Sequence, residues 1–199
     1  MLFETARFVV KPLVASDAAE HLCDWTLDPL AAEMLNTPQR IWTIESQRTY
    51  FSSHEHRKDK HLLGIWAKDE AKLIGLYVIS PHPGNQTFTL STLIGDKAWR
   101  GRGTATEATD ALYAYYFDQL GYAKAKANVR PQNKAMLWLM LSGAWKKEAH
   151  LEKHLFDEEQ GKRVDVYVLG LLAEDWRAER KANSGRNTAS IEKAKQVQS

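Results

Sequence analysis

The sequence predicts an α/β fold in which helices cover both faces of a mixed, mostly antiparallel sheet of six to seven strands. Three observations lead to this fold class. Apolar and polar residues alternate over seven short segments of the 199-residue chain, as they do in strands with one buried face. Several of these segments follow one another through short polar turns, which favours antiparallel pairing. Others are separated by segments with helical periodicity, and such a connection favours parallel pairing.

The N-terminal part of the chain is expected to form one strand and two helices. Residues 6–11 alternate between apolar and polar side chains and predict a strand with one exposed face. Asp17 is a typical N-cap residue and Glu20 follows it by three positions, so we expect a capped helix that runs to about Leu27. A less regular segment comes next, with a short helix over residues 45–53.

Three more strands are expected over residues 61–68, 72–80 and 87–94. The first two are joined by a short polar turn at residues 69–71, which suggests a hairpin. The second connection, residues 81–85, is also short and contains proline and glycine. These three strands are therefore expected to form an antiparallel meander.

A glycine-rich turn, residues 100–105, joins the last strand of this meander to a helix over residues 106–120. Thr104 and Glu107 have the spacing of a capping box, which predicts where the helix begins. The first N–H groups of a helix have no partner within it and lie at the positive end of its dipole. A strand, a basic glycine turn and a capped helix in this order therefore predict a phosphate-binding site.

The C-terminal half supplies the remaining strands and a second helix. Residues 122–129 alternate again, and because a helix precedes them we expect parallel pairing with the strand before the turn. Asn133 begins a helix that ends near Gly143 and is apolar on nearly all sides, so we expect it to be buried. Two final strands, residues 147–156 and 163–172, flank a polar turn.

Length and composition fit one globular domain. Hydrophobic residues make up 44% of the chain and charged residues 26%, which are ordinary values for such a domain. We place the domain at residues 1–176 and a basic tail at residues 177–199, where six Lys and Arg stand against two Asp and Glu. The tail has no aromatic residue, so we expect a frayed helix and then a disordered, solvated end, with no nucleic acid as partner.

The composition also argues against disulfide, metal and membrane chemistry. Cys23 is the single cysteine, which excludes an intramolecular disulfide and a cysteine-based zinc site. His150, Glu152 and His154 share one face of a predicted strand, but such neighbours lie about 7 Å apart, so we interpret them as a polar, solvent-facing set and predict no metal. No apolar run approaches about 20 residues and no signal segment is present, so we expect a soluble, cytoplasmic protein without membrane contact.

Residues 94–108 resemble the acyl-CoA-binding signature of the GNAT acetyltransferase superfamily. That signature reads Gln/Arg-x-x-Gly-x-Gly/Ala, and it is matched by Arg100, Gly103 and Ala105. Residues 142–148 are similar to the Gly-Phe-x-x-Glu-Gly ending of the same family, with alanine and tryptophan in the first two positions. The glycine-turn segment is specific enough to carry the resemblance.

Residues 7–13 and Asp17 are similar to the branch of that family that acetylates ribosomal-protein N-termini and polyamines. The resemblance then covers about residues 5–172 and implies the GNAT fold. It implies transfer of an acetyl group from acetyl-CoA to a primary amine, by direct attack in a ternary complex and without a metal. The acceptor would be a protein N-terminus or a small-molecule amine, selected in the region of residues 30–57. A homodimer is compatible with the sequence.

The resemblance also indicates which residues bind the donor. Amides of the glycine turn would hold the pyrophosphate, and the pantetheine arm would add itself beside the preceding strand. Asn133 would contact the pantetheine region, although a role as N-cap alone also explains it. The residues expected to bind acetyl-CoA are Leu93, Ile94, Arg100, Gly101, Arg102, Gly103, Thr104, Ala105 and Asn133.

The catalytic groups are less well indicated. Many members of the family place a tyrosine acid seven residues after the asparagine, and here that position is Met140, which cannot donate a proton. Ser142 on the same helix end is the candidate acid that we name, with water and a plain surface role for Ser142 as alternatives. No general base is predicted. If the site is impaired, the chain is instead a non-catalytic acyl-CoA-binding sensor module.

Overall fold

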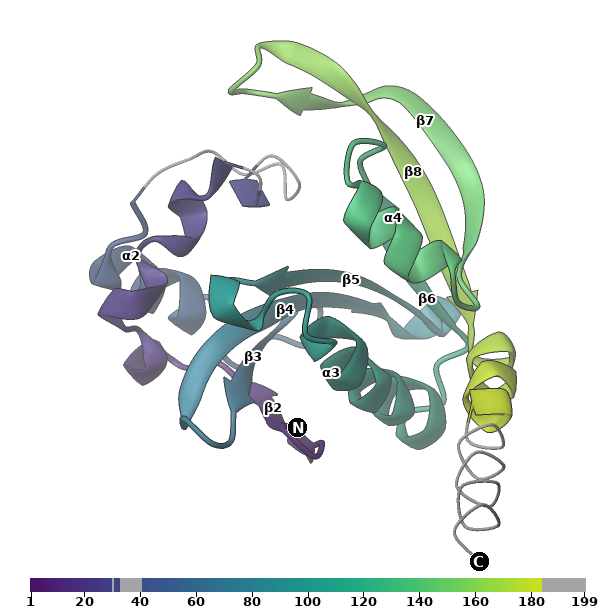
Figure 1. Ribbon diagram of the computed structural model, residues 1–199, viewed down its shortest axis with the longest axis horizontal. Coiled ribbons are helices and arrows are strands. Elements are labelled where there is room, and N and C mark those ends of the chain that lie inside the picture. Colours follow the sequence, from purple (N-terminus) through teal and green to yellow (C-terminus); the bar gives the residue numbers. More distant parts are fainter. Residues whose placement is uncertain (30, 33–40, 184–199) are drawn as a thin grey trace, which may run out of the picture.

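The computed structural model describes residues 1–29, 31–32 and 41–183 (Figure 1). At its centre is one eight-stranded sheet in the order β1-β2-β3-β4-β5-β6-β8-β7. Neighbouring strands are antiparallel except β5 and β6, so the predicted mixed, mostly antiparallel sheet is confirmed. All seven predicted strands are present, and β1 is the additional one. The strands are β1 (Phe3–Glu4), β2 (Phe8–Pro12), β3 (His61–Ala67), β4 (Lys72–His82), β5 (Thr87–Ile94), β6 (Lys124–Val129), β7 (Lys146–Asp157) and β8 (Lys162–Leu172).

The sheet opens between β5 and β6. The predicted parallel pairing is confirmed, but it spans only three residue pairs, from Thr87 with Lys124 to Thr89 with Lys126. Beyond Thr89, β5 continues to Ile94 with β4 alone beside it, while β6 stays paired with β8. The two central strands therefore diverge towards their C-terminal ends.

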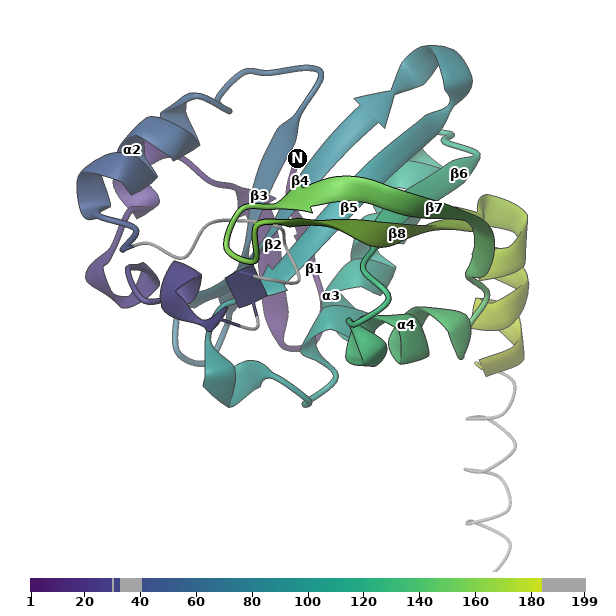
Figure 2. The same cartoon turned by 90° about the horizontal axis from the view of Figure 1, so that it is seen from above.

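Helices cover both faces of the sheet, as predicted. Helices α3 (Thr104–Tyr113) and α4 (Lys134–Leu141) lie on one face, and α2 (Ile44–Ser52) lies on the other (Figure 1). Each face has its own hydrophobic core, and adjacent residues of one strand serve different cores: Leu63 packs in the first and Leu62 in the second. Strand alternation thus builds two layers of packing from one set of strands. Strands β7 and β8 form a long hairpin that extends away from the rest of the sheet in Figure 1 and crosses in front of β4 and β5 in Figure 2.

The predicted helix from Asp17 to Leu27 is wrong. Three short 3-10 turns take its place, because the backbone at Ala19 is extended and its N–H donates to Oε1 of Gln47 on α2, at 2.9 Å. In the predicted helix this N–H would lie in the first turn, where it has no partner within the helix. The extended backbone at Ala18 and Ala19 interrupts the helix, and the N–H of Ala19 is satisfied by α2 instead. The turns are η1 (Ala15–Asp17), η2 (Glu20–Leu22) and η3 (Trp25–Leu27).

Two helices differ from expectation in detail. The predicted helix over residues 106–120 is present as α3 followed by a π-helical stretch, η6 (Ala114–Gln119). Helix α4 is apolar all round but is not fully buried: Leu137 and Met140 face the core, whereas Trp138 is 73% exposed. Apolar composition alone did not indicate which side of this helix meets the sheet.

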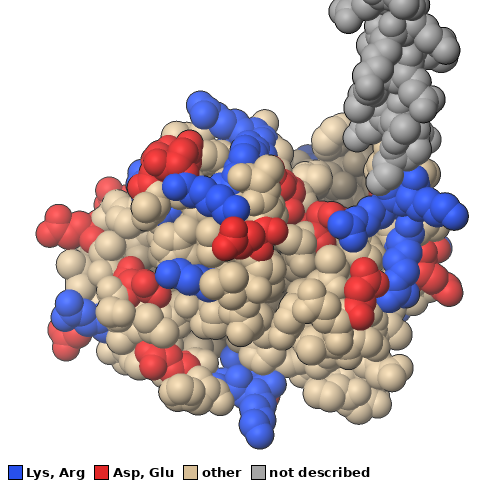
Figure 3. Space-filling view, turned by 90° about the horizontal axis from the view of Figure 1, so that it is seen from below, with Lys and Arg blue, Asp and Glu red and all other residues tan. Residues whose placement is uncertain are grey.

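The chain leaves β8 through a helix of which residues 173–183 are described, and we call it the C-terminal helix. It includes the first seven residues of the predicted tail, while residues 184–199 lie outside the described part. Nε of Arg177 donates to Asp118 at 2.8 Å, so the helix is attached to the end of η6. Acidic and basic side chains are interspersed on the face shown in Figure 3, and Lys and Arg gather where the described chain ends.

No helix in the described ranges combines the length and apolarity that a membrane crossing needs.

Replacing Phe88 by alanine tests the first core. Phe88 is fully buried on β5, and its ring lies 4.4 Å from that of Tyr116 and 5.5 Å from that of Phe117, measured between centroids. We expect a loss of about 3–5 kcal/mol in the free energy of unfolding, measured by urea denaturation. Phe156→Ala is the matched control, because Phe156 is 52% exposed on β7. Equal losses in the two variants would contradict the assigned core.

Candidate functional site

The glycine-rich turn adopts a conformation that requires its glycines. A short 3-10 turn, η5 (Lys97–Trp99), follows β5, and the chain then turns into α3. Gly101 and Gly103 have φ angles of 71° and 72°, in the left-handed region that other residues rarely adopt. A Cβ on Gly101 would meet no atom within 4 Å. The glycine there is needed for backbone conformation and leaves the approach to the turn open.

The turn presents a set of unused backbone donors. Among the described residues, no acceptor binds the N–H groups of Arg102, Gly103, Thr104 and Ala105. These N–H groups lie at the positive end of the α3 dipole, and Arg102 and Gly103 are exposed to solvent. Such an arrangement fits an anion such as the pyrophosphate of CoA.

The predicted capping box of Thr104 and Glu107 is wrong. The N-cap of α3 is Gly103, and the hydroxyl of Thr104 donates instead to the carbonyl of Trp99 at 2.8 Å. Glu107 accepts from the backbone N–H of Arg7 at 3.0 Å and from its Nε at 2.6 Å. The carboxylate therefore ties α3 to the start of β2, one hundred residues away in sequence.

Arg100 holds the glycine turn in place through contacts with the end of β5 and with Asp28. Its Nε donates to the carbonyl of Ile94 at 2.8 Å, and its guanidinium forms an ion pair with Asp28. Its backbone N–H is bonded to the carbonyl of Lys97 at 3.2 Å. Arg100, which was predicted to bind acetyl-CoA, thus has its guanidinium and its backbone N–H bonded within the protein. The hydrogen bond from Arg100 lowers the pKa of Asp28, a carboxyl group that is 8% exposed.

A second contact fixes the N-terminal segment against the turn. The ring of Trp25 packs on Gly95, where a Cβ would lie only 1.9 Å from the ring. Asp28, three residues later, holds Arg100. The described segment that leads into the predicted acceptor region is thus bound directly to the glycine turn.

Along the open edge of β5, every second residue directs its backbone N–H and C=O away from β4. The N–H of Gly95 donates to the carbonyl of Ile74 across this strand pair at 3.0 Å, and the register is regular. Hydrogen bonding alternates along an antiparallel strand, so Leu93 faces β4 while Thr92 and Ile94 face the open side. For backbone contacts with the pantetheine arm, the geometry therefore favours Thr92 over the predicted Leu93. Ile94 remains a candidate.

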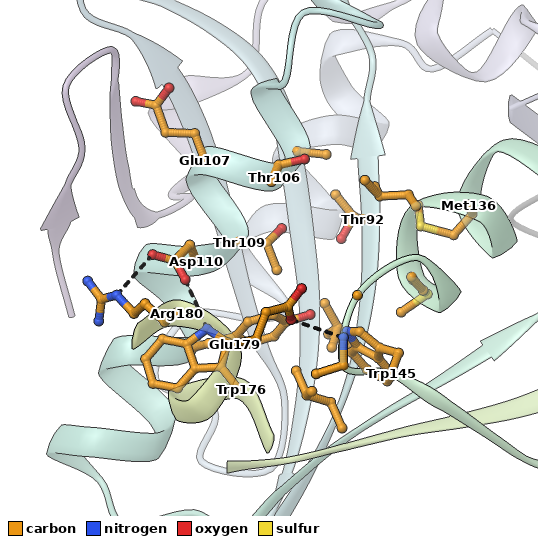
Figure 4. A pocket seen from close by; sticks show the side chains of 18 of the residues that line it. Thr92, Thr106, Glu107, Thr109, Asp110, Met136, Trp145, Trp176, Glu179 and Arg180 are labelled. Carbon is orange, nitrogen blue, oxygen red and sulfur yellow. Dashed lines mark hydrogen bonds and ion pairs between the residues drawn. The ribbon is translucent and has the colours of Figure 1, made fainter. Parts of the chain in front are cut away.

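Two cavities meet at this open edge. The larger, of about 470 Å³, lies between β5, α3, α4 and the C-terminal helix (Figure 4). The smaller, of about 190 Å³, lies between β5, β6 and α4. The two cavities share lining residues on β5 and α4, so they adjoin at the place where β5 and β6 diverge. The shared residues are Leu90, Thr92, Met136 and Met140.

The predicted residues of α4 differ in their relation to these cavities. Asn133 caps the helix by accepting from the N–H of Met136 at 3.1 Å, and it also lines the smaller cavity. Met140 is buried and lines both. Ser142 lines neither, and its exposed hydroxyl donates to the carbonyl of Leu139 at 3.2 Å. The structure therefore does not bring Ser142 to the site.

Hydroxyl groups that the sequence did not single out line the larger cavity. Thr92 comes from β5, and Tyr113 comes from the last turn of α3. Burial raises the pKa of Tyr113, so the phenol gives up its proton less readily than an exposed tyrosine. Across the described ranges, no three His, Cys, Asp or Glu side chains are grouped to hold a metal ion, and His150 instead bonds Asp165 at 2.8 Å.

Asp28→Asn tests how the turn is braced. The pKa of Asp28 lies below its ordinary value of 3.8 in the folded protein, so its ion pair stabilises the fold above that value and is lost as pH falls through the folded pKa. We expect the substitution to cost about 1–2 kcal/mol at pH 7, by urea unfolding, and progressively less below pH 4. Asp118→Asn, in an exposed pair with Arg177, should cost less at pH 7. A loss from Asp28→Asn that does not change with pH would contradict this role.

A family model described as an acetyltransferase (GNAT) domain matches residues 7–142. This range contains the glycine turn, the open edge of β5 and all of α4.

Two bacterial proteins are similar over most of the chain. An uncharacterized N-acetyltransferase p20 of Bacillus licheniformis is 31% identical over 179 residues, which cover 86% of this chain and 96% of that protein. A probable N-acetyltransferase YjcK of Bacillus subtilis (strain 168) is 26% identical over 173 residues, covering 83% and 94%.

Solved structures share the fold at low identity. A spermidine N-acetyltransferase from Vibrio cholerae, in complex with CoA and spermine, has a TM-score of 0.74 at 16% identity and covers 86% of this chain and 99% of its own. A ribosomal-protein-S5-alanine acetyltransferase from Vibrio fischeri has a TM-score of 0.73 at 19% identity, covering 88% and 98%. The family model and the relative from Bacillus licheniformis show that the chain belongs to the GNAT acetyltransferase family, which confirms the acyltransferase class predicted from its sequence.

Proposed function

We propose that the protein transfers an acetyl group from acetyl-CoA to a primary amine, either a protein N-terminus or a small-molecule amine. The observation that carries this proposal is that the turn amides and the open edge of β5 lie next to each other. Four turn amides that have no acceptor among the described residues lie at the start of α3, and they follow the edge of β5 that no described strand pairs with beyond Thr89. The structural neighbours named for spermidine and for an S5 alanine support an amine as acceptor, without choosing between the two kinds.

The described residues fit CoA as donor. The amides of Arg102 to Ala105 are donors for the pyrophosphate. The open edge of β5 offers the N–H and C=O of Thr92 and the N–H of Ile94 to the pantetheine arm, in the manner of an added strand, while the carbonyl of Ile94 accepts from Arg100. The cavity beside this edge is lined mainly by apolar side chains, which suits an alkyl arm and an acyl group.

The chemistry follows from these positions. Bound acetyl-CoA supplies an activated thioester carbonyl. The neutral amine attacks the carbonyl carbon in a ternary complex, so that a C–N bond forms and the C–S bond breaks. N–H groups on the open edge of β5 stabilise the charge that develops on the carbonyl oxygen. An amine with a pKa of about 8–10 must first lose a proton to solvent or to a base.

The departing thiolate needs a proton that Met140 cannot give. Two sources remain: solvent, and the phenol of Tyr113, a residue that lines the cavity but whose raised pKa makes it a weaker acid than an exposed tyrosine. Ser142 lies outside both cavities, and we do not retain it as the acid. Met140 also supports the second candidate function, a non-catalytic acyl-CoA-binding sensor, since it replaces the usual proton donor.

A thiol-release assay distinguishes the two functions. We expect purified protein to release CoA thiol from acetyl-CoA when a panel of polyamines and N-terminal peptides is supplied, and to release little without acceptor. Binding of acetyl-CoA, measured in parallel by calorimetry, tests the donor site itself. Binding without turnover across the panel would favour the sensor; no binding at high micromolar acetyl-CoA would sink both functions.

Gly103→Glu tests the position of the pyrophosphate. A glutamate there places a carboxylate beside the turn amides, and we expect it to abolish CoA binding in a protein that remains folded. Gly121→Glu is the control, because Gly121 has nearly the same φ, 71°, at the far end of the same helical segment. The two variants share the cost of a left-handed glutamate, so only a difference in affinity reports on the phosphate site. Unchanged CoA affinity in Gly103→Glu would refute the assignment.

A further inference from the structure

The C-terminal helix forms the end wall of the larger cavity. Its residues at positions 176, 179, 180 and 183 all line the cavity (Figure 4). These positions are spaced by three and four residues, so they lie on one face of the helix. This helix begins after β8 and lies outside the range that the family model matches.

The same face is bonded to both side walls of the cavity. Nε1 of Trp176 donates to Oδ1 of Asp110 on α3 at 2.9 Å. The carboxylate of Glu179 accepts from the N–H of Ala144, just beyond α4, at 3.0 Å. A Cβ on Gly143 would lie 2.9 Å from this carboxylate. The C-terminal helix therefore fixes how the ends of α3 and α4 sit against each other.

Asp110 places a negative charge in a cavity whose proposed ligand is a polyanion. It lies five residues after Ala105, about 8 Å along the axis of α3 from the turn amides. A carboxylate at that distance repels bound phosphates, and the repulsion is strongest at low ionic strength. Arg180 opposes it: its Nε is 3.6 Å from Oδ2 of Asp110, and its guanidinium carbon lies 5.2 Å from the centre of the Trp176 ring.

We propose that the C-terminal helix is part of the donor site and that Arg180 is a positioning residue, which neutralises Asp110 so that the neighbouring turn amides accept the phosphates of CoA. The proposal rests on the proposed function, because it concerns the same donor. Arg180 acts through Asp110, so removal of the carboxylate should make the arginine dispensable.

A charge cycle on this pair tests the proposal, with CoA as the titrant in calorimetry at low ionic strength. We expect Arg180→Gln to weaken CoA binding about three- to tenfold and Asp110→Asn to strengthen it. The double variant, which again has no net charge at the pair, should return to within about twofold of the unmodified protein. Arg180→Lys should keep most of the affinity, and all differences should shrink at about 0.5 M salt.

Arg177→Gln is the matched control. Arg177 lies on the same helix and pairs with Asp118 at 2.8 Å, but it does not line the larger cavity. We expect its replacement to leave CoA affinity unchanged. Circular dichroism of each variant verifies that the helix is retained.

Three results would overturn the proposal. A double variant as weak as Arg180→Gln would show that Asp110 is not the reason for the loss. Equal losses in Arg177→Gln and Arg180→Gln would assign the helix a purely structural role. Unchanged affinity in Arg180→Gln would also refute it, while CoA binding by the unmodified protein would keep the proposed function intact. Failure of the unmodified protein to bind CoA would instead defeat the proposed function, and this inference with it.

Discussion

The parallel ladder between β5 and β6 spans only three residue pairs, and the location of the site depends on where that ladder stops. Beyond Thr89, the edge of β5 that faces β6 has backbone groups with no partner strand. Backbone N–H and C=O groups at such an edge are ready to pair with an added chain. The glycine turn follows the same strand, so its unused amides begin where the open edge ends. One early divergence of two strands thus creates both halves of the proposed donor site.

The glycine turn is held in place by residues far from it in sequence. Arg100 joins the turn to Asp28, and Trp25 packs against Gly95. On α3, Glu107 forms an ion pair with Arg7, the residue directly before β2. A binding loop fixed in this way loses little conformational freedom when a ligand arrives, which favours affinity. The segment that carries Trp25 and Asp28 leads towards the predicted acceptor region. The contacts of these two residues therefore connect the donor turn with that region.

The strands and the glycine turn were predictable because both signals are local. Alternation with period two located every predicted strand, and the residues of the turn indicated a phosphate site before any partner was known. Glu107 shows the limit of local spacing: its interval from Thr104 fits a capping box, yet the stronger partner is an arginine one hundred residues away. The 17–27 helix was likewise predicted from local spacing, but the backbone at Ala18 and Ala19 is extended and the N–H of Ala19 donates to Gln47 on α2.

The chemical details of the site depended on tertiary geometry. The register of β5 against β4 decides whether the backbone groups of Leu93 or of Thr92 face the opening. The residue types do not indicate this register. Tyr113 reaches the cavity just before α3 passes into a π-helical stretch, where the helical period changes. A frayed helix was expected from residue 177 on; in the structure Glu179 accepts from the N–H of Ala144, just beyond α4, and Trp176 before it donates to Asp110 on α3. Contacts of this kind are visible only once the strands are assembled.

The most direct test of the proposed donor site is amide hydrogen exchange, followed residue by residue by NMR with and without CoA. Binding as proposed should slow exchange at Thr92, Ile94 and the turn amides from Arg102 to Ala105. Leu93, whose N–H already faces β4, should change little. Saturating CoA that leaves the turn and the open edge unprotected, or protects a different surface, would contradict the proposed site.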